Sequence, residues 1–400
     1  MKTRYLMALV LGLAAVAAAI NCAPVDPAAE EARNAQTARR GPEQPPPDEA
    51  PLLTPELLKT QQPGQPVAAP DPIKQRIDAA IAQVRRRKLR TDNGFWTVFH
   101  YILGLGPSVK LYNPETKEDV NALDYIAAGG KMPGVSFIPT PDGLDVETGP
   151  GTFTKQGHQD QFVAEMVEWN VSPDRKFVVG GKSYIFQDFL RHSKARASLK
   201  NPELEWAIVI ISSYYGTDLT WINAAGEKLH FEDLIRAELD KDVDKAACGG
   251  THLLFGLSWS YHIHLRHGGQ SVGVWKEIAD KTALYKKKAR ETQNPDGALS
   301  TDWFKGRANN PDVGERIRTT GHMLEWLALA LTDEELREPW VQSAASALAM
   351  MLLENQHQGL DGGSMYHAVH GLLLYSSRVY GADKLGESAP HAPLPLAKKG

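Results

Sequence analysis

The sequence predicts an all-α protein, an α/α toroid of inner and outer helices with small β-hairpins in its N-terminal half. Three observations support this fold class: helices that are apolar on most faces, amphipathic helices that alternate with them, and a repeated hairpin-like segment. A helix that is apolar almost all the way round lies inside a protein, where a second layer shields it. Six such inner helices, alternating with amphipathic ones, can close into a ring with the apolar set inside.

The apolar helices recur along the whole chain. Four of them are expected to begin near Gly94, Gly157, Glu203 and Gly250. After Gly269 the pattern is one of plain helix pairs: outer helices over 272–292 and 339–355, and inner helices over 319–331 and 365–380. Recurrence on this scale indicates stacked supersecondary units.

The repeated segment aligns on an aspartate, at Asp124, Asp188 and Asp233. About ten residues before each aspartate lies a short extended piece with a turn signal, at 112–114, 178–182 and 222–226. Extended residues on either side of Gly, Asn or Pro are typical of a hairpin. We therefore expect three small hairpins, each followed by an amphipathic helix.

Residues 1–22 have the pattern of a secretory signal. Lys2 and Arg4 precede an apolar run that ends at Ile20, which is short for a membrane span. Cys22 stands where a bacterial lipoprotein carries its lipidated cysteine, and the residues before it partly resemble a lipobox, except for Asn21. Lipidation of Cys22 and simple cleavage nearby are the two alternatives, and both place the protein in the cell envelope or periplasm.

The remaining boundaries follow from composition. Residues 23–72 are rich in Pro, Ala, Gln and Glu, and such a segment buries too little apolar surface to offset its chain entropy. We expect a disordered tether there, the toroid domain over 73–383, and a disordered tail over 384–400. Cys248 then has no disulfide partner, so the core alone must stabilise an exported domain.

The overall charge excludes one class of partner. The formal net charge is −4, and no face is predicted to concentrate Lys and Arg, so nucleic acid is not an expected partner. Membrane contact is expected only through an N-terminal lipid. The oligomeric state is not indicated.

A family resemblance rests on two segments of the C-terminal third. Residues 293–297, Gln-Asn-Pro-Asp-Gly, running to Trp303, resemble the Gln, Asp-Gly and Trp signature of the terpenoid cyclase and protein prenyltransferase superfamily, and 356–363 is a looser copy. The resemblance implies the toroid architecture over about 92–381. It does not extend to chemistry, because the Asp-x-Asp-Asp acid of the cyclases, the Asp-x-Cys zinc ligands of the prenyltransferases and the Cys-Gly-Glu-Gln of the thioester proteins are all missing.

Histidines near the starts of the inner helices are the candidate ligand-binding residues. In a toroid these helices run parallel, so His158, His252, His322 and His367 are expected at one mouth of the barrel. Imidazoles beside helix N-termini can bind an anion, transfer protons or ligate a metal. The alternative is that each histidine only caps its own helix. No tight His/Asp/Glu spacing supports a metal, so neither a metal nor another cofactor is expected.

The candidate catalytic residues are His322, Glu325 and Asp160. His322 and Glu325 share a helix face as a base and its orienting group, and a second carboxylate, Asp160 or Asp361, would supply an acid. The alternative is that Glu325 only bonds to a neighbouring inner helix. Trp326 and Tyr366 are expected to contribute aromatic surface to the ligand site.

Three functions are consistent with these patterns. The first is an exported protein of unresolved activity that binds a small-molecule or glycan ligand at the histidine mouth. The second is a carbohydrate-active lyase or hydrolase, which rests on analogy of fold. The third is a non-catalytic scaffold or protein-interaction module, so whether the protein is an enzyme stays open.

Overall fold

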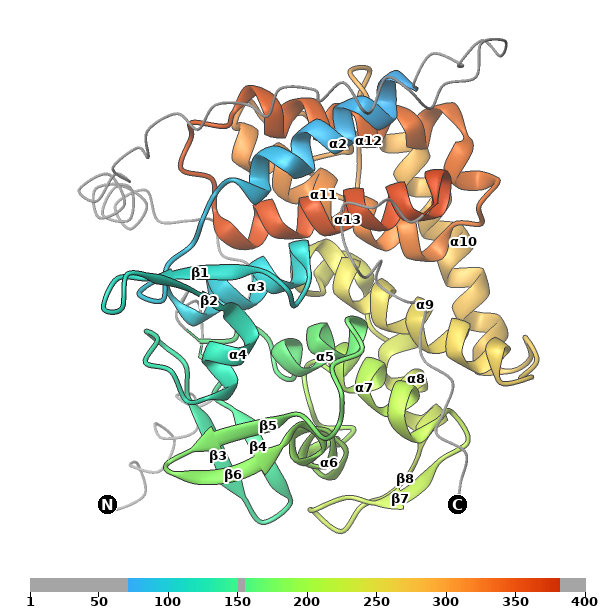
Figure 1. Ribbon diagram of the computed structural model, residues 1–400. Coiled ribbons are helices and arrows are strands. Elements are labelled where there is room, and N and C mark those ends of the chain that lie inside the picture. The colour runs from blue at the N-terminus through green and yellow to red at the C-terminus, as the bar shows by residue number, and fades with distance from the viewer. Residues whose placement is uncertain (1–70, 150–154, 382–400) are drawn as a thin grey trace, which may run out of the picture.

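The computed structural model describes residues 71–149 and 155–381. These residues form a mainly helical structure with small antiparallel hairpins, as the sequence predicts (Figure 1). The signal segment, Cys22, nearly all of the 23–72 segment and the 384–400 tail lie outside the described residues. Within the described ranges, no helix combines the length and apolar character needed to span a bilayer.

Six helices are buried along most of their length or over a long central stretch, and they contact one another in chain order. The last of them, α13, packs against the first, α3, so the series returns to its start. They are α3 (Phe95–Leu105), α5 (Gln161–Glu168), α7 (Glu205–Tyr215), α9 (Thr251–Arg266), α11 (Val313–Ala330) and α13 (Gly362–Tyr380).

The remaining helices pack against this set. Helix α2, which precedes the predicted repeats, lies beside α12 from the other end of the described chain (Figure 1). The remaining α-helices are α2 (Pro72–Arg85), α4 (Ala122–Ala127), α6 (Phe186–Arg196), α8 (Phe231–Leu239), α10 (Val274–Thr292) and α12 (Pro339–Glu354). Short 3-10 turns cover Val243–Lys245 (η2), Ala247–Gly250 (η3) and Glu335–Arg337 (η4).

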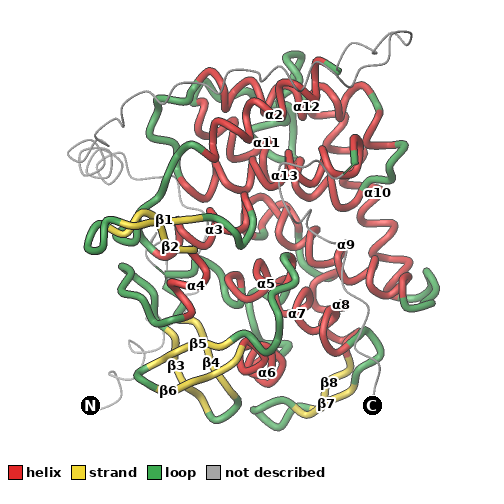
Figure 2. The backbone as a smooth tube through the Cα atoms, in the orientation of Figure 1, coloured by secondary structure: helices red, strands yellow, loops and turns green. Residues whose placement is uncertain are grey.

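The expected hairpins are confirmed, and each pairs two short antiparallel strands. They are β1 (Lys110–Asn113) with β2 (Glu118–Asn121), β5 (Lys176–Val179) with β6 (Lys182–Ile185), and β7 (Thr220–Ile222) with β8 (Lys228–His230). A hairpin that we did not anticipate, β3 (Phe137–Thr140) with β4 (Gly143–Val146), turns through Pro141 and Asp142. Figure 2 shows β3 to β8 at the edge of the molecule farthest from α2 and α12.

Two of the three repeated aspartates have a capping function, whereas Asp124 pairs with Arg175 and its helix is capped by Asn121. The carboxylates of Asp188 and Asp233 accept hydrogen bonds from the amides of Ile185 and His230, at 3.0 and 2.7 Å, where a strand turns into a helix. This is one half of a capping box, in which a residue in the first helical turn reaches back to the helix start. The repeat in the sequence is therefore the signature of a strand-to-helix junction.

Helix α5 begins at Gln161 rather than near Gly157, and two later helices also start away from their predicted positions. Helix α11 begins at Val313 rather than near 319, because Asp312 accepts hydrogen bonds from the amides of Gly314 and Glu315 as an N-cap. Helix α13 begins at Gly362 rather than near 365, because Asp361 caps it in the same way. Both helices are therefore longer than expected, and His322 and His367 lie inside them rather than near their ends.

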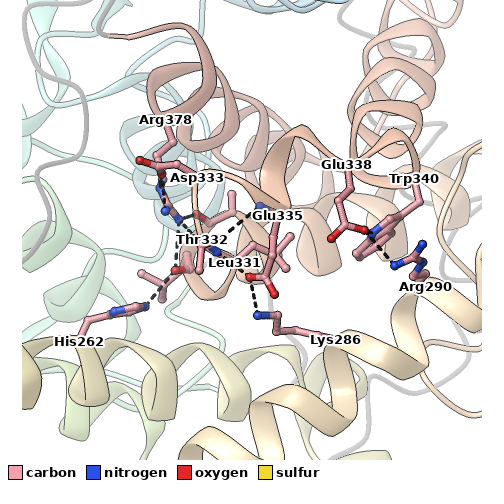
Figure 3. Close-up of polar contacts among 12 residues, drawn as sticks. His262, Lys286, Arg290, Leu331, Thr332, Asp333, Glu335, Glu338, Trp340 and Arg378 are labelled. Atoms are coloured by element: carbon pink, nitrogen blue, oxygen red, sulfur yellow. Dashed lines mark hydrogen bonds and ion pairs between the residues drawn. The ribbon is translucent and has the colours of Figure 1, made fainter.

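Charged side chains fix the connection between α11 and α12 (Figure 3). Lys286 and Arg290 of α10 pair with Glu335 and Glu338 at 2.6 and 2.9 Å. Arg378 of α13 pairs with Asp333 at 2.6 Å and also donates to the carbonyls of Ala328 and Leu331 at the end of α11. The acidic residues over 333–338, which follow α11, thus connect α10, α11 and α13. Their role is structural rather than catalytic.

Helices α11 and α13 approach closely through glycines. A Cβ atom added at Gly321 would lie 2.8 Å from the Cα of Ala368, and one at Gly371 would lie 2.9 Å from the amide nitrogen of Glu325. Distances this short do not occur between real side chains and backbone, so each position accepts only glycine at this spacing.

We expect Gly321→Ala to lower the free energy of unfolding by about 1 to 3 kcal/mol, since the methyl group must force the two helices apart. Gly306→Ala is the matched control, because its added methyl group meets nothing within 4 Å. Urea denaturation of both variants measures the difference, and equal losses in the two would contradict the close-approach argument.

A buried carboxyl group lies at the start of α7. Burial raises the pKa of Glu205 to about 8, and the neighbouring Glu238 and Glu203 add to the shift. Glu205 and Glu238 both accept a hydrogen bond from the Leu204 amide, at 3.0 and 3.1 Å. The folded protein therefore keeps a proton on Glu205 at pH values where an unfolded chain loses it.

This shift makes stability depend on pH. The stabilising contribution is complete below the usual pKa of 4.5 and is lost as the pH rises toward 8. We expect Glu205→Gln, which stays neutral, to gain about 2 to 4 kcal/mol relative to the unsubstituted protein between pH 5 and pH 9. Chemical denaturation across this range tests the prediction, with exposed Glu118→Gln as the control. Parallel pH profiles for all three proteins would show that Glu205 is not the responsible group.

Candidate metal centre

Three histidine side chains from three different helices meet in the interior. The ring centres of His322 and His367 lie 4.1 Å apart. The ring centre of His252 lies 5.5 Å from that of His322 and 5.7 Å from that of His367. All three residues are buried, with exposed fractions of 2 to 4%. The convergence expected for the histidines is therefore present, although it lies in the interior rather than at a row of helix ends.

The cluster extends in two directions from these three residues. On one side, the ring of His158 lies 4.9 Å from that of His252, and Cys248 lies close to both. On the other side, the ring of His100 lies 5.1 Å from that of His367, and the carboxylate of Glu165 is 3.8 Å from His100. We call these seven residues the His/Cys/Glu cluster: His100, His158, Glu165, Cys248, His252, His322 and His367.

The cluster divides into three groups with metal-binding geometry. Within each group one potential ligand atom from each residue lies within 4.8 Å of the others. The groups are His158, Cys248 and His252, then His252, His322 and His367, and finally His100, Glu165 and His367. Neutral imidazole, thiolate and carboxylate are the side chains that bind zinc and other transition metals.

An outer layer of acceptors orients four of the five rings through their Nδ1 atoms. The Nδ1–H groups of His100 and His322 donate to the carbonyl oxygens of Trp96 and Arg318, at 2.7 and 2.8 Å. The Nδ1 atoms of His158 and His367 lie 3.0 and 2.8 Å from the carboxylates of Glu203 and Glu325. Metal-binding histidines have this second layer almost without exception, because it fixes the tautomer and directs the other nitrogen toward the metal.

Glu325 has a central position in this outer layer. Its two carboxylate oxygens accept from the Nδ1–H groups of His367 and His370, at 2.8 and 2.6 Å. Burial opposes ionisation of Glu325, but the two imidazoles lower its pKa overall. Helix α11 thereby fixes the orientation of two rings on α13.

Several polar atoms in the cluster have no partner among the described residues. Both ring nitrogens of His252 and both carboxylate oxygens of Glu165 are buried without a hydrogen bond. Burying a polar group without a partner costs about 1 to 3 kcal/mol. The space between His252, His322 and His367 has no room for a water molecule, so a bridging water is not the missing partner.

The protonation states suit metal ligands. Burial holds the pKa of His252, His322 and His100 well below the usual value, with neighbouring imidazoles adding to the effect. These rings are therefore neutral at pH 7 and carry a lone pair. Burial, with Glu168 and Glu325 nearby, raises the pKa of Glu165 well above its usual value.

A tight backbone turn brings Cys248 to the cluster. Cys248, Gly249 and Gly250 have φ values of 49°, 63° and 82°, a left-handed conformation that favours glycine. A Cβ atom at Gly249 would overlap the ring of Trp303, so the indole lies directly on the turn. The hydroxyl of Thr251 donates to the Cys248 carbonyl at 2.8 Å. The glycines that follow Cys248 therefore serve to present its thiol.

The other predicted site residues lie elsewhere. Asp160 is in the left-handed region just before α5 and pairs with Arg196 at 2.6 Å, and Ser193 donates to it. Trp326 donates from its indole to Ser258 at 3.1 Å. Tyr366 packs on Tyr101, with ring centres 5.3 Å apart. Asp160 is therefore occupied in an ion pair, and the two aromatic residues belong to the core.

The sequence analysis missed five members of the site: His100, Glu165, Cys248, Glu203 and His370. Glu165 left a signal, since a charged residue in the apolar segment of α5 needs a special partner. His100 left the same signal within α3. Cys248 was considered only for a disulfide and for motifs of adjacent residues, whereas His158, which lies close to it, comes from another part of the chain.

The chain was compared with protein-family models, curated proteins and solved structures, and none of them matches it.

Because Asp160 serves the fold, we expect Asp160→Asn to lower the free energy of unfolding by about 2 to 3 kcal/mol, since Arg196 loses a charged partner. Asparagine tolerates the left-handed backbone, so the change isolates the charge. Thermal unfolding measures the loss. Unchanged stability would indicate that the ion pair of Asp145 with Arg196 is enough to stabilise the guanidinium without Asp160.

Proposed function

We propose that the protein is an exported helical protein that binds transition-metal ions in its His/Cys/Glu cluster. The observation that carries this proposal is the combination of three ligand groups, buried except for the half-buried His158, with an outer layer that fixes the imidazole tautomers. Capping alone does not account for buried rings whose remaining nitrogens converge on one another. A bound cation would give a partner to the ring nitrogens of His252, which are buried without one among the described residues.

The ligand types narrow the choice of metal. Imidazole nitrogens with one thiolate favour zinc or copper over magnesium and calcium, which prefer oxygen ligands. The group around Cys248 contributes two nitrogens and one sulfur, and the group around His322 contributes three nitrogens. Both sets are typical of zinc and copper sites.

The close packing favours a structural or electron-transfer centre over a substrate-binding one. A catalytic zinc keeps an open position for water, and the space among the three central histidines does not hold one. The same packing does not favour a glycan in the cluster, so the ligand we propose is the metal ion itself.

We also propose the toroid arrangement and the tethered location. Support for the toroid comes from the neighbour order of the six inner helices, in which α13 returns to α3, and from the resemblance around 293–303. Support for export comes from the signal pattern over 1–22 and from Cys22. A metal centre suits such a location, because a buried ion stabilises a domain whose described residues contain a single cysteine, Cys248.

We expect the tag-free chain carrying Cys22→Ser to retain zinc or copper after dialysis, and to unfold at a higher temperature with the metal than with a chelator. Glu325→Gln removes the charge that orients His367 and His370, so it is expected to weaken metal binding about 10- to 100-fold. Elemental analysis and competition titrations with a chromophoric chelator measure both effects.

The matched control is His267→Ala, which removes an exposed histidine outside the cluster and is expected to leave affinity unchanged. If the chain retains neither zinc nor copper, and neither metal changes its unfolding temperature, the proposed function is wrong. If Glu325→Gln and His267→Ala bind metal with equal affinity, Glu325 does not support metal binding by orienting the two rings.

A further inference from the structure

His252 belongs to two of the three ligand groups. It shares one with His158 and Cys248 and the other with His322 and His367, and these two groups have no other residue in common. One residue therefore has to serve both groups, or one of the groups must remain incomplete.

The two groups approach the His252 ring in different ways. The ring of His158 is nearly perpendicular to it, at 86°, whereas the rings of His322 and His367 are each inclined by 34°. Trp206 lies against the same ring, with centres 5.0 Å apart, so an apolar wall holds the imidazole between the groups.

His252 also differs from the other rings of the cluster in its outer contacts. His100, His158, His322 and His367 each have Nδ1 held by an oxygen acceptor. His252 has no such acceptor among the described residues, and both of its nitrogens are buried without a partner. A ring with one metal-facing nitrogen needs an acceptor for the other, whereas a ring that binds two metals needs none.

We propose that His252 bridges two metal ions as an imidazolate, one nitrogen binding an ion held by His158 and Cys248, and the other binding an ion held by His322 and His367. This inference rests on the proposed metal-binding function and specifies it as a dinuclear centre. A neutral imidazole carries one proton, so forming the second metal–nitrogen bond releases that proton to solvent. The Cys248 thiol releases another when its sulfur binds metal.

The third group does not add a third ion. The Nδ1 atom of His367 is hydrogen-bonded to the Glu325 carboxylate, so only its Nε2 atom can bind a metal. An ion held by His322 and His367 already uses that Nε2 atom. The group of His100, Glu165 and His367 therefore competes with the central one. The expected stoichiometry is two ions per chain.

The test uses the tag-free full chain with Cys22→Ser, loaded with Co(II). Cobalt reports a thiolate ligand through a near-ultraviolet charge-transfer band, and two cobalt ions joined by an imidazolate lower each other's magnetic moment on cooling. We expect two cobalt ions per chain, the thiolate band, and a moment that falls with temperature.

Three variants assign the signals. His252→Ala is expected to abolish the magnetic coupling and to reduce the cobalt content to one ion or none. His322→Ala, which leaves the Cys248 side intact, is expected to keep one ion and the thiolate band without coupling. His267→Ala, the exposed control, is expected to behave as the parent chain. If His252→Ala does not fold, the comparison of His322→Ala with the parent still decides the result.

The outcomes separate the bridge from the metal site. One cobalt ion per chain, or two ions with the moments of isolated cobalt, would overturn the bridge while the metal-binding function stands. Retention of no metal at all would overturn both.

Discussion

The contact between Glu325 and two histidines of α13 constrains the whole centre. An ionised carboxylate with only 6% of its residue surface exposed is tolerated where hydrogen-bond donors surround it, and His367 and His370 provide them. Those donors reach the carboxylate only because α11 and α13 approach through Gly321 and Gly371. Backbone packing, charge burial and ring orientation are thus parts of one arrangement, and altering any of them moves the ligands.

The rest of the cluster follows the same logic on other helices. Each ring except that of His252 is fixed by an acceptor on its own helix or on a neighbouring segment, such as the carbonyl of Trp96 for His100 and the carboxylate of Glu203 for His158. The cluster therefore draws on several inner helices and on the turn before α9. A site built in this way is rigid, because no single loop carries it.

Much of the fold could be predicted from local pattern. Apolar helices, hairpin turns and the repeated aspartates are periodic features, and the structure has helices and hairpins at those places, with errors at the caps Asp312 and Asp361. The convergence of histidines was predicted from the repeat. The full ligand set was not predicted from the sequence, because His100, Glu165 and Cys248 are far apart in the chain and only tertiary packing brings them together. Asp160 was misassigned because its partner, Arg196, lies on another helix.

The position of α2 has a consequence for how the molecule is made. This helix packs on α12 and α13, and Asp71 at its start accepts a hydrogen bond from Tyr380 at the end of α13, at 3.1 Å. A chain synthesised from its N-terminus therefore releases α2 long before the partners of that helix exist. Contacts this distant in sequence make folding slow, and the unfinished molecule exposes apolar surface meanwhile. The last of the described helices to emerge, α13, brings His367 and His370 and completes the packing of α2 and α3, so assembly of the centre and closure of the fold coincide.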